Sequence, residues 1–333
     1  MESKGQSITA GQILEGKLMS AAQAVERFVP DGAMVALGGF TVNRNPMLLA
    51  REIIRQKRRG LHLVVHSQGQ SMDLLIGAGC VERVELAYGG TGRFAPTGIR
   101  FRKAVQEGSL MVEDYSNFQM SLRFLAGSLG LPYMPCRSGL GSDVLARQRF
   151  GPEIRGRGKV PRYKMLVQDN PFNPEESEPV VLLPALTPDV ALIHAQYVGS
   201  GGTVRIKGLT FLDVEQAKAA DHVIVTCEEI VPEEFLRRDP DQNHLPHFLI
   251  DAVVPAPFGA HPTACHRFYD YDPKHLNYYR QVAGDDRSFQ EYLDEWVLGP
   301  ADQEQYLDLL EPGDLLRIKA NSAVGYAPGL DRR

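Results

Sequence analysis

The residues of this chain best placed to do chemistry are Gly38 and Gly39, which stand between a short apolar run and a helix. Residues 35–37 predict a buried strand, and Asn45 predicts the N-cap of a helix over residues 46–58 that begins with proline. Such a turn lets a ligand approach bare backbone N–H groups at the positive end of a helix dipole, and we expect positive φ at Gly39. It would suit an acyl oxyanion or a carboxylate, although a purely structural turn has the same sequence.

A second group of polar residues directly follows the next predicted strand. His66, Ser67, Gln68, Gly69 and Gln70 read as a loop at the carboxyl end of that strand. His66 and Ser67 do not form a nucleophile–base pair, because adjacent side chains of an extended segment point to opposite faces. A turn with polar side chains and no function explains the same pattern, so both interpretations stay open.

A third glycine loop, at residues 138–143, contains Gly139 and Gly141, and it is typical both of a loop that faces phosphate or pantetheine and of a plain turn. Glu228 and Glu229 follow a predicted strand as paired carboxylates. Such a pair could act in acid–base catalysis, or it could stabilise the first turn of a helix.

Metal binding is not expected, because His261, Cys265 and His266 match no zinc-ligand spacing. The four cysteines are far apart and form no Cys-x-x-Cys pair, which is typical of reduced thiols in a cytoplasmic protein.

Composition excludes several classes of protein. The 333 residues carry a net charge of −5 and the pI is about 6.0, so we expect no nucleic-acid partner. The polar N-terminus resembles no secretory signal, and no window has the roughly 18 apolar residues of a membrane span. We therefore expect a cytoplasmic protein without membrane contact.

The elements that must position these residues alternate between apolar runs and helical patterns. This alternation predicts an α/β fold with a mostly parallel sheet and helices on both faces. Ligands of such sheets bind outside the carboxyl ends of the strands, where the glycine turns fall. The predicted strands are at 35–37, 61–65, 83–88, 110–112, 180–183, 190–193 and 223–226, and the predicted helices are at 20–28, 46–58, 72–76, 98–107, 118–129 and 289–310.

The chain is expected to form a single domain over residues 16–325, preceded by a flexible N-terminal arm at residues 1–15. A charged segment rich in proline and glycine, at about residues 147–179, breaks the alternation and reads as an excursion from the sheet.

Residues 31–46 resemble the first signature of the family I CoA-transferases, which has an acidic residue and glycine, three apolar residues, Gly-Gly-Phe and a proline six residues on. Arg44 replaces the usual glycine, as in the glutaconate-type A subunits of that family. The resemblance covers about residues 20–325. It continues through residues 72–77, 113–116, 129–132, 169–172, 193–196, 202–206, 225–230, 237–240, 251–254, 259–262 and 269–272.

The resemblance implies an A subunit that moves CoA between an acyl-CoA and a small (di)carboxylic acid such as glutaconate. In this family the thioester is attacked by a glutamate of the B subunit, and the reaction passes through an acyl anhydride and an enzyme–CoA thioester. A B-type partner is therefore expected, with CoA as a substrate, no permanently bound cofactor and no catalytic residue in this chain. Gln68 occupies the loop analogous to the nucleophile loop of the B subunit, but an amide cannot ionise.

The residues expected to contact the substrate or CoA all belong to the three glycine-containing segments. They are Gly38, Gly39, Phe40, Arg44, Ser67, Gln68, Gly69, Gln70, Gly139 and Gly141. For Arg44 two roles stay open, a clamp on the distal carboxylate of a dicarboxylic acid or a structural salt bridge.

Relatives with the same two-subunit architecture have activities other than CoA transfer, so alternatives stay open. The chain could belong to an acyl-CoA hydrolase or decarboxylase, or it could bind acyl-CoA without catalysis. Glu113 lies near the segment where the hydrolases carry a working glutamate, although the residues around it resemble the transferase form better.

Overall fold

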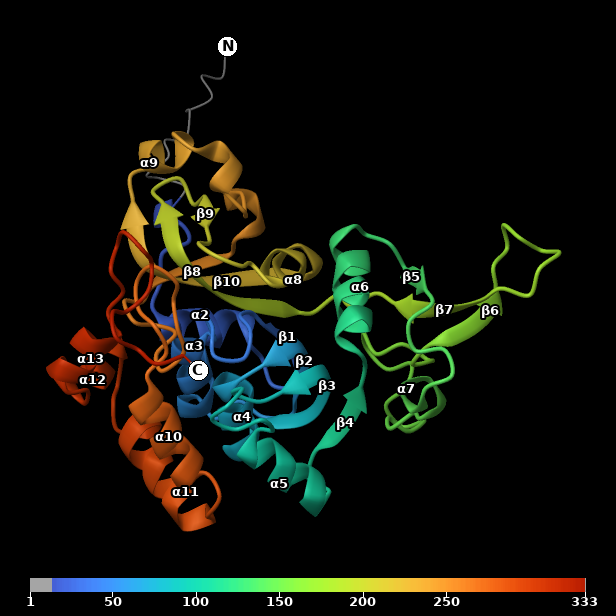
Figure 1. Cartoon of the computed structure of the whole chain (residues 1–333), viewed down its shortest axis with the longest axis horizontal. Helices are drawn as coiled ribbons and strands as arrows, with labels where there is room; N and C mark the ends of the chain where they lie inside the picture. The colour runs from blue at the N-terminus through green and yellow to red at the C-terminus, as the bar shows by residue number, and fades with distance from the viewer. Residues whose placement is uncertain (1–13, 333) are drawn as a thin grey trace, which may run out of the picture.

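The computed structural model describes residues 14–332, and its centre is an eight-stranded sheet (Figure 1). In spatial order the strands are β11 (Ala252–Pro255), β10 (His222–Val231), β8 (Val190–Gly199), β1 (Met34–Leu37), β2 (Leu61–Gln68), β3 (Val81–Gly89) and β4 (Met111–Asp114). All of these neighbours pair in parallel, and only the short β9 (Val204–Arg205) pairs antiparallel, with β8. The predicted mostly parallel sheet is confirmed.

Helices cover both faces of this sheet, as predicted. Along β1, Val35 and Leu37 enter one hydrophobic core while Met34 and Ala36 enter the other, because successive side chains of a strand point to opposite faces. The first core is completed by α2 (Ala21–Phe28), α3 (Met47–Arg55), α4 (Gln70–Gly77), α10 (Pro273–Val282) and α11 (Asp286–Leu293). The second is completed by α6 (Asn117–Ser128) and α8 (Asp213–Ala219).

The helix after the Gly-Gly turn begins later than the sequence predicts. Its N-cap is Pro46 and its first residue is Met47, so the assignment of Asn45 as N-cap is wrong. The Asn45 amide instead bridges neighbouring backbone, donating to the Asn43 carbonyl at 3.2 Å and accepting from the Ser71 N–H at 3.4 Å. The side chain thus holds the turn against the start of α4.

A second, smaller sheet stands apart from the main one, beyond α6 (Figure 1). It is antiparallel and consists of β5 (Tyr133–Cys136), β7 (Pro179–Pro184) and β6 (Leu166–Asp169), with α7 (Asp143–Ala146) beside it. The predicted strand at 180–183 exists, but it belongs to this sheet. The proposed excursion at 147–179 supplies β6, and its described residues add no strand to the main sheet. All but two residues of the expected N-terminal arm lie outside the described residues.

The C-terminal region is more broken than the single helix predicted at 289–310. After α11 the chain makes a π-helical turn, Asp294–Leu298, and then a separate helix, α12 (Gln303–Asp308). Pro300 lies between them, where its ring and missing N–H prevent a continuous helix. The remaining helices are α5 (Ile99–Glu107), α9 (Glu233–Arg237), α13 (Pro312–Ile318) and the 3₁₀ turns Pro240–Gln242 and His247–Leu249. No helix in the described part of the chain is long and apolar enough to cross a membrane.

Candidate functional site

The Gly-Gly turn at the carboxyl end of β1 requires glycine at its second position. Gly39 has a φ of +81°, as expected, and a Cβ there would lie 2.4 Å from the Asn43 carbonyl oxygen. Both the backbone conformation and the space therefore exclude a side chain.

The backbone N–H groups of this turn are already used inside the protein. The expectation that they are bare and available to an acyl oxygen is wrong for this structure, because each donates to a protein acceptor. The pairs are Gly38 N–H to the Leu192 carbonyl at 2.9 Å, Gly39 N–H to Asp213 Oδ1 at 2.6 Å and Phe40 N–H to the Asn43 carbonyl at 2.8 Å. The turn shapes this edge of the sheet without offering an N–H oxyanion hole.

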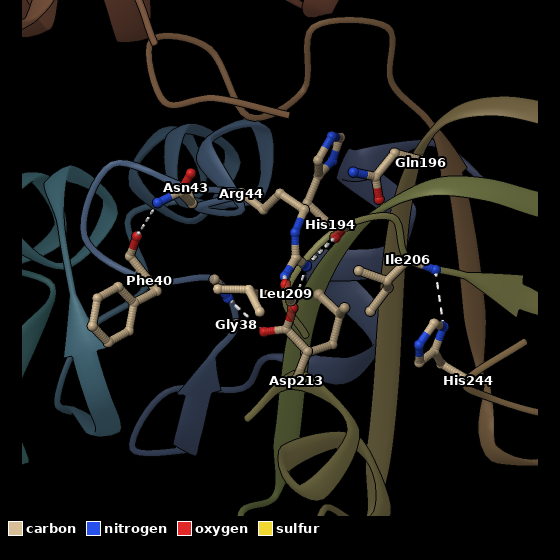
Figure 2. A network of polar contacts seen from close by, with 12 residues as sticks. Gly38, Phe40, Asn43, Arg44, His194, Gln196, Ile206, Leu209, Asp213 and His244 are labelled. Carbon is tan, nitrogen blue, oxygen red and sulfur yellow. Dashed lines mark hydrogen bonds and ion pairs between the residues drawn. The ribbon is translucent and has the colours of Figure 1, made fainter. Parts of the chain in front are cut away.

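Arg44 is a buried structural residue of the same turn. Its guanidinium forms an ion pair with Asp213 and donates to the Leu209 carbonyl at 2.5 Å (Figure 2). It also lies 3.4 Å from the His194 carbonyl, and only 2% of the residue is exposed. Of the two roles left open by the sequence, the structure contains the salt bridge.

Gln68 also has a structural environment. Ser67 and Gln68 are the last residues of β2, not part of a loop as predicted, and both are buried. The Gln68 amide donates to the Leu37 carbonyl at 3.1 Å and to the Gly38 carbonyl at 2.7 Å, and its oxygen accepts from the Gly69 N–H at 2.7 Å. The side chain therefore ties the ends of β1 and β2 together.

The backbones of the first two glycine segments touch directly. A Cβ on Gly69 would lie 1.9 Å from the Thr41 carbonyl oxygen, and the Thr41 N–H donates to the Ser67 carbonyl at 3.0 Å. Gln70, by contrast, is the first residue of α4 and reaches the Tyr292 hydroxyl at 3.2 Å, on the side of the sheet covered by α11. Its side-chain amide thus contacts α11 and not the glycine turn.

The start of α6 joins the third glycine loop to β2. The Ser67 hydroxyl is 2.8 Å from Asn117 Oδ1 in the first turn of this helix. The hydroxyl of its N-cap residue, Ser116, lies 3.4 Å from the Ser138 hydroxyl, and the Gln119 amide donates to the Ser138 carbonyl at 3.0 Å.

Gly139 and Gly141 differ in how tightly they are packed within this loop. Both have positive φ, +93° and +72°. A Cβ on Gly139 would lie 2.5 Å from the Gln119 amide nitrogen, while Gly141 has open space around it. The loop is thus docked on α6 through Gly139, and the three glycine segments are linked along one edge of the molecule.

Three aromatic rings lie on the partly exposed surface at this edge. Phe40 stacks on Phe211 at 4.7 Å between ring centroids and lies 5.8 Å from His66. Burial lowers the pKa of His66, so its imidazole is neutral at pH 7. Phe211 has a φ of +51°, a strained conformation for a residue with a side chain and one that clusters at functional sites. The sequence offered no signal for Phe211, because its contact with Phe40 joins distant segments.

The acidic residues suggested by the sequence are not free nucleophiles. Glu228 accepts from the Tyr269 hydroxyl at 2.6 Å and the Phe258 N–H at 2.8 Å, and it lies 2.7 Å from the His194 ring. Glu229 is its neighbour within β10 and is exposed, so the two carboxylates do not form an acid–base pair or a helix first turn.

Glu113 is likewise engaged, by the segment that follows the third glycine loop. It is fully buried on β4, accepts from the Arg149 N–H at 2.8 Å and forms an ion pair with Arg155. A carboxylate held in this way serves the packing of residues 149–155 against the main sheet.

Among the described residues, Cys265 does not share a possible ligand set with His261 and His266, the neighbours considered in the sequence. Cys265 instead lies beside His194 and Glu228, with one ligand-type atom from each within 4.8 Å of the others. Hydrogen bonds already satisfy the Glu228 carboxylate, and burial raises the pKa of the Cys265 thiol well above its ordinary value. We interpret this group as a hydrogen-bonded core.

Known proteins share the sequence and the α/β fold of this chain. The model of the Coenzyme A transferase family matches residues 18–256, and the chain belongs to this family. It is 39% identical to the A subunit of glutaconate CoA-transferase from Acidaminococcus fermentans, over 93% of this chain and 97% of that protein. It is 33% identical to the A subunit of 3-oxoadipate CoA-transferase from Pseudomonas knackmussii, over 87% of this chain and 96% of that one.

The solved structures include the same architecture. The crystal structure of glutaconate coenzyme A-transferase from Acidaminococcus fermentans superposes with a TM-score of 0.89, covering 93% of this chain and 98% of that one. This chain is therefore a homologue of the A subunits of CoA-transferases.

Proposed function

We propose that this chain is the A subunit of a two-subunit enzyme that transfers CoA between an acyl-CoA and a small carboxylic acid, with the nucleophilic glutamate on a B-type partner. The main support for this proposal is the environment of Gln68. The family reaction needs an ionised carboxylate, and the amide of Gln68 occupies the end of β2 with all three of its hydrogen bonds made inside the protein. The partner must then supply the nucleophile.

Exposed apolar side chains beside the candidate site support a partner protein. Leu209, whose carbonyl holds Arg44, is 74% exposed, and Phe118, which follows Asn117 at the start of α6, is 57% exposed. We infer that these exposed side chains are covered by another protein, as exposed apolar patches are at interaction sites. We place the B-type partner over this edge, where it would complete the site.

We expect the side chains of Phe40, His66 and Phe211 to contact the acyl group, because these rings lie together and are partly exposed at this edge. Gly38, Gly39, Ser67, Gln68 and Gly69 act by shaping it. We keep Gly139 and Gly141 as candidate substrate contacts, since their loop docks on the start of α6 beside Ser67.

A small dicarboxylic acid such as glutaconate is the acceptor that we favour. The two relatives above are named for glutaconate and 3-oxoadipate, which are both dicarboxylic acids. Arg44 is committed to Asp213, so the distal carboxylate has to be bound by other donors. We propose CoA as a substrate with no resident cofactor. The four free cysteines support a cytoplasmic location.

The complex of this chain with its B-type partner should be tested on a panel of acyl-CoA donors and small mono- and dicarboxylic acids. We expect a new acyl-CoA to form only when an acceptor acid is present, with dicarboxylic acids giving the highest kcat/KM. Release of free CoA at the same rate without any acceptor would instead identify a hydrolase, and CO₂ release would identify a decarboxylase.

A further inference from the structure

A pocket of about 590 Å³ opens between the loop after β3, α5 and the end of α10. Three arginines from these three elements line it, namely Arg93, Arg102 and Arg280, together with Phe94 and Thr97. Its lining contains no aspartate or glutamate, although the chain as a whole carries a net charge of −5. Three cations gathered in one pocket repel each other, and an anionic ligand would offset that repulsion.

The pairing of charges around the pocket leaves two of these cations available. On the same helix, α5, Arg100 and Lys103 both pair with Asp286, at 2.9 and 2.5 Å. Within residues 14–332, Arg102 and Arg280 make no ion pair with a carboxylate. A guanidinium group can donate two parallel hydrogen bonds to the oxygens of one phosphate. Two such groups without a carboxylate partner are therefore suited to bind a phosphate ester.

Arg93, which lines the same pocket, is held in place by other residues. Its guanidinium lies 5.2 Å from the ring of Phe94 and 5.8 Å from that of Tyr271, and it donates to the Asp331 carbonyl at 2.7 Å. Stacking of this kind fixes the direction of an arginine side chain and reduces the conformational entropy lost when a ligand binds.

The pocket is connected to the candidate site by a short piece of backbone. The Gly90 N–H donates to the Gln68 carbonyl at 2.8 Å, which fixes the start of the loop beside the end of β2. Arg93 follows three residues later, so its Cα lies at most about 11 Å from that of Gly90. An extended ligand could therefore have its reacting end near Phe40 and its charged end in the pocket.

We propose that this pocket binds the phosphorylated ADP end of coenzyme A, through its 3′-phosphate and diphosphate. This inference rests on the proposed function, because it assumes that CoA is the substrate. The pantetheine arm would run from the arginine pocket along the loop at residues 90–98 to the aromatic edge of the site.

The test is calorimetric binding to the complex of this chain with its B-type partner, with CoA and pantetheine as separate ligands. The double variant Arg102→Gln/Arg280→Gln should weaken CoA binding at least tenfold and leave pantetheine binding unchanged. The control is Arg287→Gln, because Arg287 is an exposed arginine on α11 that pairs with Glu291 outside the pocket. It should leave both affinities unchanged.

Equal losses for CoA and pantetheine, or no loss for either, would overturn the assignment. Weaker assembly of the two subunits with unchanged CoA affinity would also overturn it, and would make the pocket a contact for an acidic surface of the partner. Binding needs no turnover, so a complex that binds CoA through these arginines but transfers nothing would contradict only the proposed function.

Discussion

Among single residues, Gln68 is the one that most clearly indicates that the nucleophile belongs to a partner subunit. An amide can donate to two carbonyls and accept from an N–H at the same time, and Gln68 does so with Leu37, Gly38 and Gly69. An ionised carboxylate only accepts, so it would face two carbonyl oxygens without a proton between them. The position is therefore built for an amide.

Gln68→Glu should accordingly destabilise the chain and should not create a nucleophile. We expect the free energy of unfolding, measured by urea denaturation at pH 7, to fall by at least about 2 kcal/mol, because two buried hydrogen bonds are replaced by a charge beside carbonyl oxygens. Gln106→Glu, on the exposed side of α5, is the matched control and should change stability by less than about 0.5 kcal/mol. Unchanged stability of the Gln68 variant would show that the position tolerates a carboxylate.

At the scale of elements, the candidate site depends on two strand-to-helix turns packed backbone to backbone. The turn from β1 to α3 places Thr41 against Gly69 in the turn from β2 to α4, and the Ser67 carbonyl accepts from Thr41. Phe40, which belongs to the first turn, is thereby fixed beside His66 on the second strand. The aromatic edge formed by Phe40, His66 and Phe211 depends on this close packing, because a side chain between the two turns would push them apart.

Gly69→Ala should disturb both stability and substrate binding. The added Cβ would lie 1.9 Å from the Thr41 carbonyl oxygen, so the first turn must move, at an expected cost of about 1–3 kcal/mol in the free energy of unfolding. We also expect the KM for acyl-CoA to rise in the assembled complex, because Phe40 moves with the turn. Gly313→Ala, where the structure leaves open space, is the control. Equal behaviour of the two variants would contradict the close contact.

The packing of α10 against α11 predicts a pH dependence of stability. His275 is buried and lies 2.9 Å from the Tyr292 hydroxyl. Burial, reinforced by the nearby His261, lowers the pKa of His275 to about 3. Because the unfolded chain binds this proton near pH 6.5 and the folded chain does not, stability is full above that pH and falls as the pH decreases towards 3.

His275→Gln should remove this contribution. Between pH 6 and 4.5 the free energy of unfolding of the unmodified chain should decrease more steeply than that of the variant, by up to about 1.4 kcal/mol per pH unit. Urea denaturation at several pH values in this window measures both slopes. Parallel slopes would mean that His275 is protonated in the folded protein as readily as in the unfolded one.

Across the whole molecule, the sequence predicted most strands and helices, which depend on local patterns. It did not predict contacts between residues that are far apart in the chain. The alternation of apolar runs with helical patterns predicted the parallel sheet. The helix predicted at 20–28 is confirmed as α2, and it was predictable because Ser20 and Gln23 form a local capping box at its start. The end of β2 was misplaced, since Ser67 and Gln68 are polar yet continue the pairing with β3. No local pattern could show that Phe211 stacks on Phe40 or that Asp213 neutralises Arg44.

The chain that carries the covalent intermediate can be identified directly. The complex with the B-type partner is incubated with acyl-CoA and no acceptor acid, the chains are separated under denaturing conditions, and each is weighed by mass spectrometry. We predict a CoA adduct on the partner and an unmodified mass for this chain. A CoA adduct on this chain would place the nucleophile here and contradict the assignment of Gln68 and the buried carboxylates as structural residues.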